Sequence, residues 1–502
     1  MKEINKSNTV QAFWVALGTL STFGLSIVSA AILSRYFDKA EYGTYKQILY
    51  VYGSLLIVFT GGLPRVFAYF LPRHNISEGK AIIWKVSKLL FFCGVGFSLF
   101  LFISSDLIAK FLNNEQLAYA LKVFSPVPML LLPTLGLEGI LSTYKKTMYL
   151  AVYNTLSRLF MLASIVTPVI FFGGTVITAI YGWIISSFII LILAVYFKTL
   201  PFRDVESLPS HLSFKEIFTY SIPLVTASLW GMAIKAADQF YISHYFGSEV
   251  FAEYSNGFIE LPFVSMITAS TAVVLMPVFS KIVHEGNQTN ELLVIWKSAI
   301  LKSATLIYPM VVFAIFFSND LMGLLYSSQY ESSGVYFKIN LILNFFNIVI
   351  FAPLIFSLGE TKFYTNLHVL IAVLIWLGGY LVLKVFNSPI AIAVLSVSLN
   401  IFKILLAMKF VSKKLEVRLL NLFPLKKLLV VFTHNCIAIS IIMFFLNYVD
   451  SLKIVLKLMI CGILYVSILL STSRLFKINY FYSLTPIIAK VKNGFKFNRI
   501  SK

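Results

Sequence analysis

The sequence predicts an all-α polytopic membrane protein with about fourteen transmembrane helices: two six-helix lobes related by an internal repeat, plus two C-terminal helices. Of its 502 residues, 59% are hydrophobic and 12% are charged, and the mean hydropathy is +0.86. This composition excludes a soluble globular protein. Apolar runs of about 20 residues, long enough to cross the roughly 30 Å hydrocarbon core, recur along the chain. Runs of that length predict helices rather than the alternating strands of a barrel.

The internal repeat is the second observation behind this class. Residues 32–45, ILSRYFDKAEYGTY, align without gaps on residues 241–254 at an offset of 209 positions. Ser34 then meets Ser243, and Tyr45 meets Tyr254. Six spans per copy return the chain to its starting side, so the two copies have parallel topology. Two shorter matches follow in the same order: LPRVF (63–67) on LMPVF (275–279), and FISSDL (102–107) on FFSNDL (316–321).

The apolar runs define the predicted elements in chain order. The proline-containing polar stretch at 198–216 is typical of a linker between lobes. The fourteen spans cover about residues 10–33, 46–71, 89–111, 119–143, 148–172, 176–197, 217–245, 257–283, 298–318, 335–357, 363–384, 389–411, 428–447 and 453–473. The predicted domains are an N-terminal lobe (1–197), a cytoplasmic linker (198–216), a C-terminal lobe (217–411), the two added spans (412–475) and a basic cytoplasmic tail (476–502).

The net charge of +20 reports orientation rather than nucleic-acid binding. With the N-terminus inside, most lysines and arginines fall in inner segments, as the positive-inside rule requires. An even number of spans then places both termini in the cytoplasm. The basic residues left in outer segments are Arg35, Lys39, Lys46, Lys110, Lys122, Lys338, Lys384, Lys453 and Lys457.

The repeated segment 32–45, the residues 222–257 of span 7 and the stretch DLMGLLYSSQYESSG (320–334) together resemble the polysaccharide transporter family. This family contains O-antigen and capsule repeat-unit flippases of the multidrug/oligosaccharidyl-lipid/polysaccharide exporter superfamily. The resemblance covers spans 1 to 12 and implies two lobes around a central cavity in a bacterial cytoplasmic membrane. It implies flipping of an undecaprenyl-pyrophosphate-linked oligosaccharide by alternating access. The implied partners are this substrate and membrane lipids, with polysaccharide polymerase machinery as a candidate.

Cationic side chains far from span ends are the first candidate site residues: Arg65, Arg158, Lys235 and Lys403. A charge at mid-bilayer costs at least about 2.5–3.5 kcal/mol, so such residues usually face the bundle interior or water. Together they predict an electropositive cavity suited to a lipid pyrophosphate. Arg65 alternatively serves a helix break at Pro64, and Lys403 alternatively snorkels to the inner surface.

Acidic and amide side chains form the second group of candidates. Asp238 lies three residues after Lys235, so the two form either a structural pair or an ion-coupling site. Glu260 is the other candidate for coupling to H⁺ or Na⁺. Asn340, Asn344 and Asn347 follow one helical stripe, which predicts contacts to sugar hydroxyls or, alternatively, hydrogen bonds between helices.

The sequence is compatible with three transport functions. The sequence contains no Walker-type phosphate loop and no cysteine or histidine spacing of a metal site, so we expect neither ATP hydrolysis nor a metal, catalytic residue or cofactor. An enzyme is therefore not expected. A repeat-unit flippase fits a basic cavity. A cation-coupled multidrug antiporter would need an acidic, aromatic cavity, and a lipid II flippase of the same superfamily is the third alternative.

Overall fold

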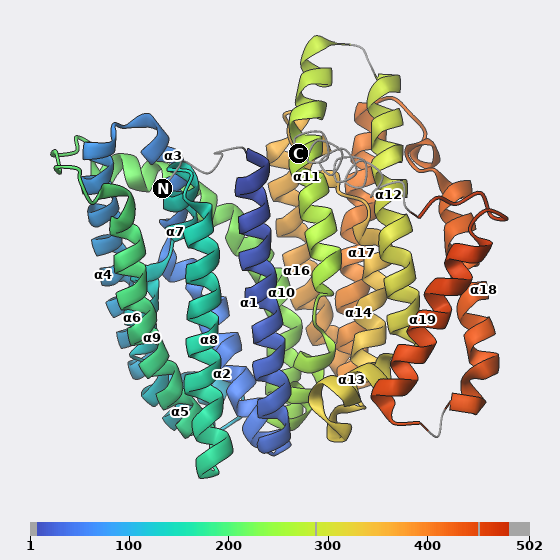
Figure 1. Cartoon of the computed structure of the whole chain (residues 1–502), viewed down its shortest axis with the longest axis horizontal. Coiled ribbons are helices and arrows are strands. Elements are labelled where there is room, and N and C mark those ends of the chain that lie inside the picture. The colour runs from blue at the N-terminus through green and yellow to red at the C-terminus, as the bar shows by residue number, and fades with distance from the viewer. Residues whose placement is uncertain (1–7, 287–288, 450–451, 481–502) are drawn as a thin grey trace, which may run out of the picture. The chain divides into compact units, whose positions relative to one another are not determined.

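The computed structural model describes residues 8–286, 289–449 and 452–480, and every regular element among them is a helix (Figure 1). Thirteen of these helices are long and apolar enough to cross a membrane, or fourteen if one bent pair counts as a single span. The predicted all-helical class is therefore confirmed, and each predicted span has a helical counterpart. Residues 481–502 of the predicted basic tail lie outside the described residues.

The contacts between residues divide the chain into two compact units. Unit 1 comprises Met1–Ser255, Leu325–Ser327 and Ile375–Ile392, and unit 2 comprises Asn256–Leu324, Ser328–Leu374 and Ala393–Lys502. The predicted boundary between lobes at 198–216 stays a prediction. The helices of residues 8–257 are α1 (Asn8–Tyr36), α2 (Lys39–Thr60), α3 (Pro64–Phe70), α4 (Ile76–Phe111), α5 (Gln116–Phe124), α6 (Val127–Leu131), α7 (Leu137–Thr143), α8 (Thr147–Phe172), α9 (Val176–Thr199) and α10 (Phe214–Gly257). The later helices are α11 (Pro262–Glu285), α12 (Thr289–Phe316), α13 (Ser318–Tyr326), α14 (Ser333–Asn347), α15 (Phe351–Ser357), α16 (Thr361–Phe386), α17 (Pro389–Lys414), α18 (Leu425–Val449) and α19 (Ile454–Thr472).

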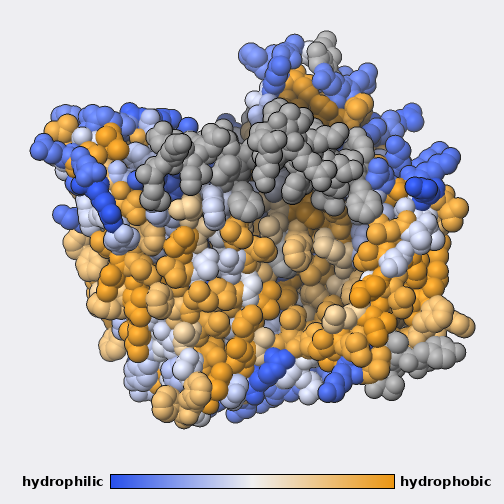
Figure 2. Space-filling model, viewed as in Figure 1, coloured by the Kyte–Doolittle hydropathy of each residue, from blue (hydrophilic) through white to orange (hydrophobic). Residues whose placement is uncertain are grey.

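The outer faces of the helices carry the apolar residues that lipid requires. Figure 2 shows hydrophobic side chains along the middle of the visible helices and hydrophilic side chains near their ends. Large apolar side chains such as Phe92, Ile103 and Phe172 are 68%, 75% and 81% exposed. Such exposure would be costly in water, but in a bilayer these side chains contact acyl chains.

Both copies of the internal repeat turn at the same aligned position. In the first copy α1 ends at Tyr36, and Asp38 caps α2 by accepting a hydrogen bond from the backbone N–H of Glu41 at 2.7 Å. Asp38 aligns with Gly247, which interrupts α10 with φ 79°. A side-chain cap and a glycine in the left-handed region thus produce the same break in two ways.

The second span bends where the sequence predicts a break, but its repeat partner does not. Gly61 and Gly62 adopt φ values of 55° and 70°, and α3 begins at Pro64 after a bend of 42° between the helices. The aligned residues of the second copy are Val273 and Val274, which cannot adopt positive φ without strain. Consequently α11 continues as one helix, even though Pro277 lies within it.

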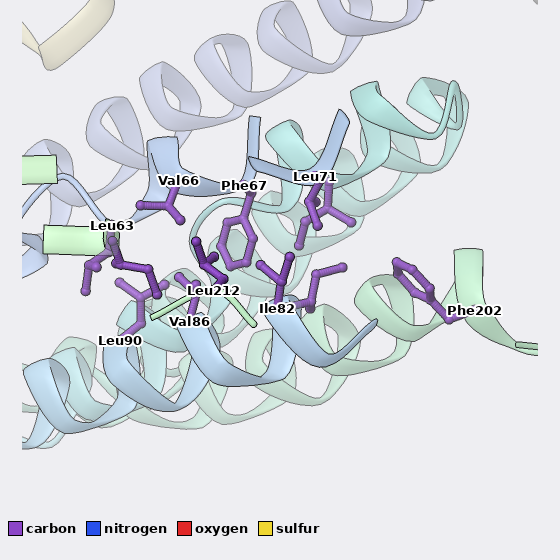
Figure 3. Packing of buried hydrophobic residues seen from close by; sticks show 12 residues of the cluster. Leu63, Val66, Phe67, Leu71, Ile82, Val86, Leu90, Phe202 and Leu212 are labelled. Carbon is purple, nitrogen blue, oxygen red and sulfur yellow. The ribbon is translucent and has the colours of Figure 1, made fainter. Parts of the chain in front are cut away.

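A buried apolar cluster holds this bend in place. Figure 3 shows Phe67 of α3 pointing toward Ile82 and Leu212, with Val66 and Leu71 beside it. Phe67 and Ile82 are fully buried. The packing of α3 on α4 in this cluster stabilises the bend.

The fourth span contains a second break, where a buried lysine donates hydrogen bonds to backbone carbonyl oxygens. Between α6 and α7 the chain passes through the 3₁₀ turn Leu132–Thr134, and Gly136 takes φ 83° against the Phe67 ring. The Lys198 ammonium of α9, 4% exposed, donates to the backbone oxygens of Pro133 at 2.6 Å and Leu135 at 3.0 Å. It also donates to Ser87 Oγ at 3.1 Å and lies 5.1 Å from the Phe67 ring centroid. Lys198 thus satisfies carbonyls that the break removes from helical pairing.

Replacing Lys198 with Met is expected to lower the stability of the protein by about 1–3 kcal/mol. Methionine keeps most of the apolar stem but leaves at least two buried carbonyl oxygens without a donor. The free energy lost in these hydrogen bonds exceeds the desolvation free energy that is saved when no ammonium is buried. The measurement is the melting temperature in detergent, followed by tryptophan fluorescence. Lys215→Met, at an exposed position of α10, is the matched control. An unchanged or higher melting temperature would mean that desolvation of the ammonium offsets its hydrogen bonds.

Candidate functional site

Unit 1 contains a pocket of about 580 Å³ between α2 and α10, called here the α2–α10 pocket. Two lysines, one tyrosine and several small polar residues line it together with aliphatic side chains. Its lining residues are Lys46, Leu49, Tyr50, Gly53, Ser54, Ile57, Ser228, Gly231, Met232, Lys235, Ala236, Gln239 and Ser255. A pocket of this size and mixed lining can hold a small ligand or the headgroup of a larger one.

Two polar stripes at helical spacing produce this pocket. On α2, Lys46, Tyr50 and Ser54 recur every four residues, so they share one face of the helix. On α10, Lys235 and Gln239 have the same spacing. Gly53 and Gly231 also line the pocket, and a Cβ built at either position would meet nothing within 4 Å. The absence of side chains at these two positions therefore leaves room between the helices.

Hydrogen bonds fix the distance between the two walls. The Tyr50 hydroxyl donates to the backbone oxygen of Ala236 at 3.1 Å. Farther along both helices, Gln47 Nε2 donates to Ser243 Oγ at 2.7 Å, and both residues are fully buried. Ser243 is one of the residues that the two repeat copies share. The repeated segment therefore holds α2 and α10 together beside the pocket.

Both charged side chains that line the pocket are lysines. The Lys46 ammonium lies 5.1 Å from the Tyr42 ring centroid and 5.9 Å from that of Tyr326. Lys235 is exposed and lines the pocket from α10. Among the described lining residues there is no aspartate or glutamate. Two ammonium groups in a partly apolar pocket attract an anion and repel a cation.

Asp238 lies on α10 beside this pocket without lining it. Its side chain is 4% exposed, its Oδ1 accepts a hydrogen bond from the backbone N–H of Gln239 at 2.7 Å, and Tyr50 lies near it. Asp238 is therefore linked to the pocket through residues that line it. Whether this carboxylate couples transport to an ion stays a prediction.

Arg158 lies among tyrosines of the same unit. It is half-buried in α8, its Nη1 donates to Met161 Sδ at 3.6 Å, and Tyr153, Tyr45 and Tyr52 lie near it. Tyr45 in turn accepts a hydrogen bond from Trp183 Nε1 at 3.1 Å. The surroundings of Arg158 are thus aromatic and polar rather than acidic.

The other two predicted cations lie elsewhere. Arg65 is exposed on α3, directly after Pro64. Lys403 is half-buried on α17 in unit 2, where its Nζ donates to Asn400 Oδ1 at 2.9 Å. Of the four predicted cations, only Lys235 lines the α2–α10 pocket. The role of all four as one cationic cavity stays a prediction.

Unit 2 brings three of the predicted polar residues together. Glu260, Asn344 and Asn347 line a pocket of about 380 Å³ between α11, α14 and α15, called here the α11–α14 pocket. Asn347 Nδ2 donates to Asn344 Oδ1 at 3.0 Å. Ser265 and Thr268 add hydroxyl groups to the same wall. This arrangement of amides, hydroxyls and one carboxylate can bind hydroxylated ligands or a small cation.

Asn340 has a different environment from the other two asparagines. It is 7% exposed, and its Nδ2 donates to the backbone oxygen of Ile259 at 2.7 Å. Ile259 lies in the non-helical stretch between α10 and α11. Asn340 therefore satisfies a carbonyl that no helix pairs, which is the structural alternative to sugar binding.

Sequence reasoning missed Lys46 and Tyr50 as site residues. Lys46 lies at the predicted start of the second span, where hydropathy places it with the outer segments. A signal for its position is present in the sequence: Lys46, Tyr50 and Ser54 form an i, i+4, i+8 polar stripe that continues into the apolar part of the span. The pairing of this stripe with α10 depends on contacts between distant segments and has no local signature.

Two solved structures share the fold of this protein. This chain superposes on the lipid II flippase MurJ in an inward closed conformation with a TM-score of 0.68 and 15% identity. The superposition covers 92% of this chain and 99% of the MurJ chain. An inward-facing multidrug resistance MATE family transporter of the MOP superfamily matches 81% of this chain and 98% of its own, with a TM-score of 0.61 and 12% identity. The fold is that of MOP superfamily transporters.

The sequence comparison gives the family. Residues 10–283, more than half of the chain, match the family described as polysaccharide biosynthesis protein, and the chain belongs to that family. Its thirteen or fourteen candidate spans make it a multi-pass membrane protein. The succinoglycan biosynthesis transport protein ExoT of Rhizobium meliloti (strain 1021) is 23% identical over 334 residues, which cover 65% of this chain and 64% of that protein. An uncharacterized membrane protein of Methanocaldococcus jannaschii is 20% identical over 95% of this chain and 97% of its own length.

Proposed function

We propose that this protein is a flippase that moves an undecaprenyl-pyrophosphate-linked oligosaccharide repeat unit across a bacterial cytoplasmic membrane for assembly of a surface polysaccharide. The observation that carries the proposal is the α2–α10 pocket, whose two lysines line a space without a carboxylate among the described lining residues. Membership of the polysaccharide biosynthesis family supports a substrate that belongs to polysaccharide assembly. The relative ExoT is named a succinoglycan biosynthesis transport protein, which agrees with this proposal.

The chemistry of the substrate explains why such a pocket is needed. A pyrophosphate headgroup must leave water and cross the hydrocarbon core, where an uncompensated charge is costly. In this proposal Lys46 and Lys235 neutralise that charge from opposite walls of the pocket. A salt-bridged phosphate can then occupy a depth in the membrane that the free anion would avoid.

The polar groups beside the two lysines suit the sugar part of the substrate. Tyr50 and Ser54 supply hydroxyl groups from the α2 wall, and Gln239 supplies an amide from the α10 wall. Hydroxyl and amide groups both donate and accept hydrogen bonds, as sugar hydroxyls do. The isoprenoid chain needs no polar partner and stays in lipid.

Loss of the protein is expected to stop polymer export and leave the completed lipid-linked repeat unit on the cytoplasmic leaflet. No other step in assembly is predicted to fail, so the repeat unit should be chemically complete. The measurement is the amount of surface polymer, together with the accessibility of the repeat unit to a membrane-impermeant reagent in spheroplasts. Normal polymer with altered resistance to cationic dyes would contradict the proposal and favour an antiporter.

Ion coupling is part of the same proposal. Asp238 beside the α2–α10 pocket and Glu260 in the α11–α14 pocket are the candidate carboxylates for H⁺ or Na⁺. Each lies next to polar groups that line a pocket, which is where an ion bound with substrate affects transport.

A further inference from the structure

A basic pocket in unit 2 is not used by the proposed transport function. It has a volume of about 1040 Å³ and lies where α12 and α18 begin and where the chain continues after α19. We call it the α12–α18 pocket. Its lining residues are Val294, Lys297, Ser298, Leu301, Lys302, Thr305, Phe423, Pro424, Leu425, Lys426, Lys427, Val430, Val431, Phe476, Lys477, Ile478 and Asn479.

The distribution of charge in this pocket is one-sided. Five lysines contribute to the lining, from α12, from the first turn of α18 and from the segment after α19. Among the lining residues that the structure describes, none is an aspartate or glutamate. The remaining walls are largely apolar, with Val294, Leu301 and Val430 among them. An anion with an attached hydrocarbon chain matches both features.

The wall after α19 is held by a buried polar network. His434 and Asn435 of α18 are 1% and 0% exposed. His434 Nδ1 lies 2.8 Å from the Tyr480 hydroxyl, its Nε2 lies 2.7 Å from Thr472 Oγ1, and its ring stacks on Phe476 at 4.3 Å. These contacts place the segment after α19, including Phe476 and its neighbour Lys477, against the start of α18.

An apolar core attaches the two added helices to α12. Val312 and Phe317 pack with residues of α18 and α19, among them Ile442, Cys461 and Tyr465. Two of the helices that line the pocket, α12 and α18, therefore pack on one another through this core.

We propose that the α12–α18 pocket binds an anionic phospholipid of the leaflet that it faces, with the lysines around the phosphate and the acyl chains along the apolar wall. The positive-inside asymmetry assigns this end of the helices to the cytoplasmic leaflet. Lysines are mobile point charges and suit a phosphodiester without fixed orientation, whereas a bidentate site would use arginine. Bilayer phospholipid also surrounds this pocket at high local concentration. The inference does not rest on the proposed flippase function.

The test is lipid binding by the full chain, purified, delipidated and studied by native mass spectrometry with phosphatidylglycerol or phosphatidylcholine. Lys426→Gln/Lys427→Gln removes two lining charges, and Lys409→Gln/Lys413→Gln removes two exposed charges outside the pocket lining. The wild type and the control are expected to prefer phosphatidylglycerol, and the pocket variant is expected to bind it about tenfold more weakly. Lys477→Gln, which changes only the segment after α19, should give a smaller loss in the same direction.

The melting temperature of each variant in phosphatidylcholine shows that it is folded. Equal binding of both lipids by the wild type would overturn the proposal. So would an equal loss in the control variant, because the effect would then be general surface charge. Displacement of phosphatidylglycerol by a low concentration of polyprenyl phosphate would also overturn it and assign the pocket to an isoprenoid lipid.

Discussion

Replacing Lys46 and Lys235 together with glutamine is expected to reduce polymer export at least about tenfold while the protein stays folded. Both lysines line the α2–α10 pocket, where Lys235 is exposed and Lys46 is half-buried. Each charged hydrogen bond to a phosphate is worth about 1.5–3 kcal/mol. Loss of two such contacts weakens binding of the headgroup by roughly 100-fold or more. The measurements are surface polymer in complemented cells and the Kd for a polyprenyl pyrophosphate in detergent.

The matched control for this pair is Lys110→Gln/Lys384→Gln, which removes two exposed charges from predicted outer segments, as Lys46→Gln does. It should export polymer normally. Lys46→Arg/Lys235→Arg keeps both charges and is expected to retain most of the activity. Normal export by the glutamine pair, at normal protein levels, would remove this pocket from the transport pathway.

The spans of this fold are predictable from the sequence because a helix in lipid satisfies its own backbone. Hydropathy alone therefore locates each helix, and the predicted fourteen spans correspond to the thirteen or fourteen of the structure. The bend at Pro64 is also predictable, since two glycines precede the proline by a few residues. Gly247 and Asp38 show that the repeat preserves a break even when the residue that makes it changes.

The sequence does not predict which face of each helix turns inward or which helices pack together. Lipid and protein interior are similarly apolar, so hydropathy does not distinguish the two faces. Lys198 illustrates this limit. At the end of a span it has the sequence environment of a snorkelling residue, yet its ammonium is buried against the break between α6 and α7. Its partner Pro133 lies 65 residues away in the chain. Lys46 is a second example, since only its position opposite α10 gives it a place in a pocket.

Replacing Gly43 with alanine is expected to destabilise the protein by about 1–3 kcal/mol and to impair export. Gly43 lies in α2 against the backbone of Ser248, the residue that follows the break at Gly247. An added Cβ would lie 2.5 Å from the carbonyl carbon of Ser248 and closer still to its oxygen. A backbone cannot move aside as a side chain can, so α2 and α10 must separate. Alanine favours a helix by about 1 kcal/mol over glycine, and the steric cost exceeds this gain.

Gly24→Ala in α1 is the matched control, because nothing lies within 4 Å of a Cβ built there. The difference between the two variants therefore reports the steric clash at Gly43. Because alanine has the higher helix propensity, the melting temperature of Gly24→Ala is expected to be unchanged or raised. The clash with Ser248 is expected to lower the melting temperature of Gly43→Ala. A raised melting temperature in both variants would show that α2 and α10 are not in close contact at Gly43.

The same substitution connects the repeat to the proposed function. The Lys39–Glu253 ion pair at 2.5 Å and the Gln47–Ser243 hydrogen bond at 2.7 Å both lie near Gly43 and hold α2 beside α10. Separation of these helices would also break the hydrogen bond from the Tyr50 hydroxyl to the backbone oxygen of Ala236 and widen the α2–α10 pocket. Gly43→Ala should therefore raise the Kd for polyprenyl pyrophosphate, although it removes no charge. Reduced stability with unchanged binding would mean that the pocket keeps its shape without the repeat contact.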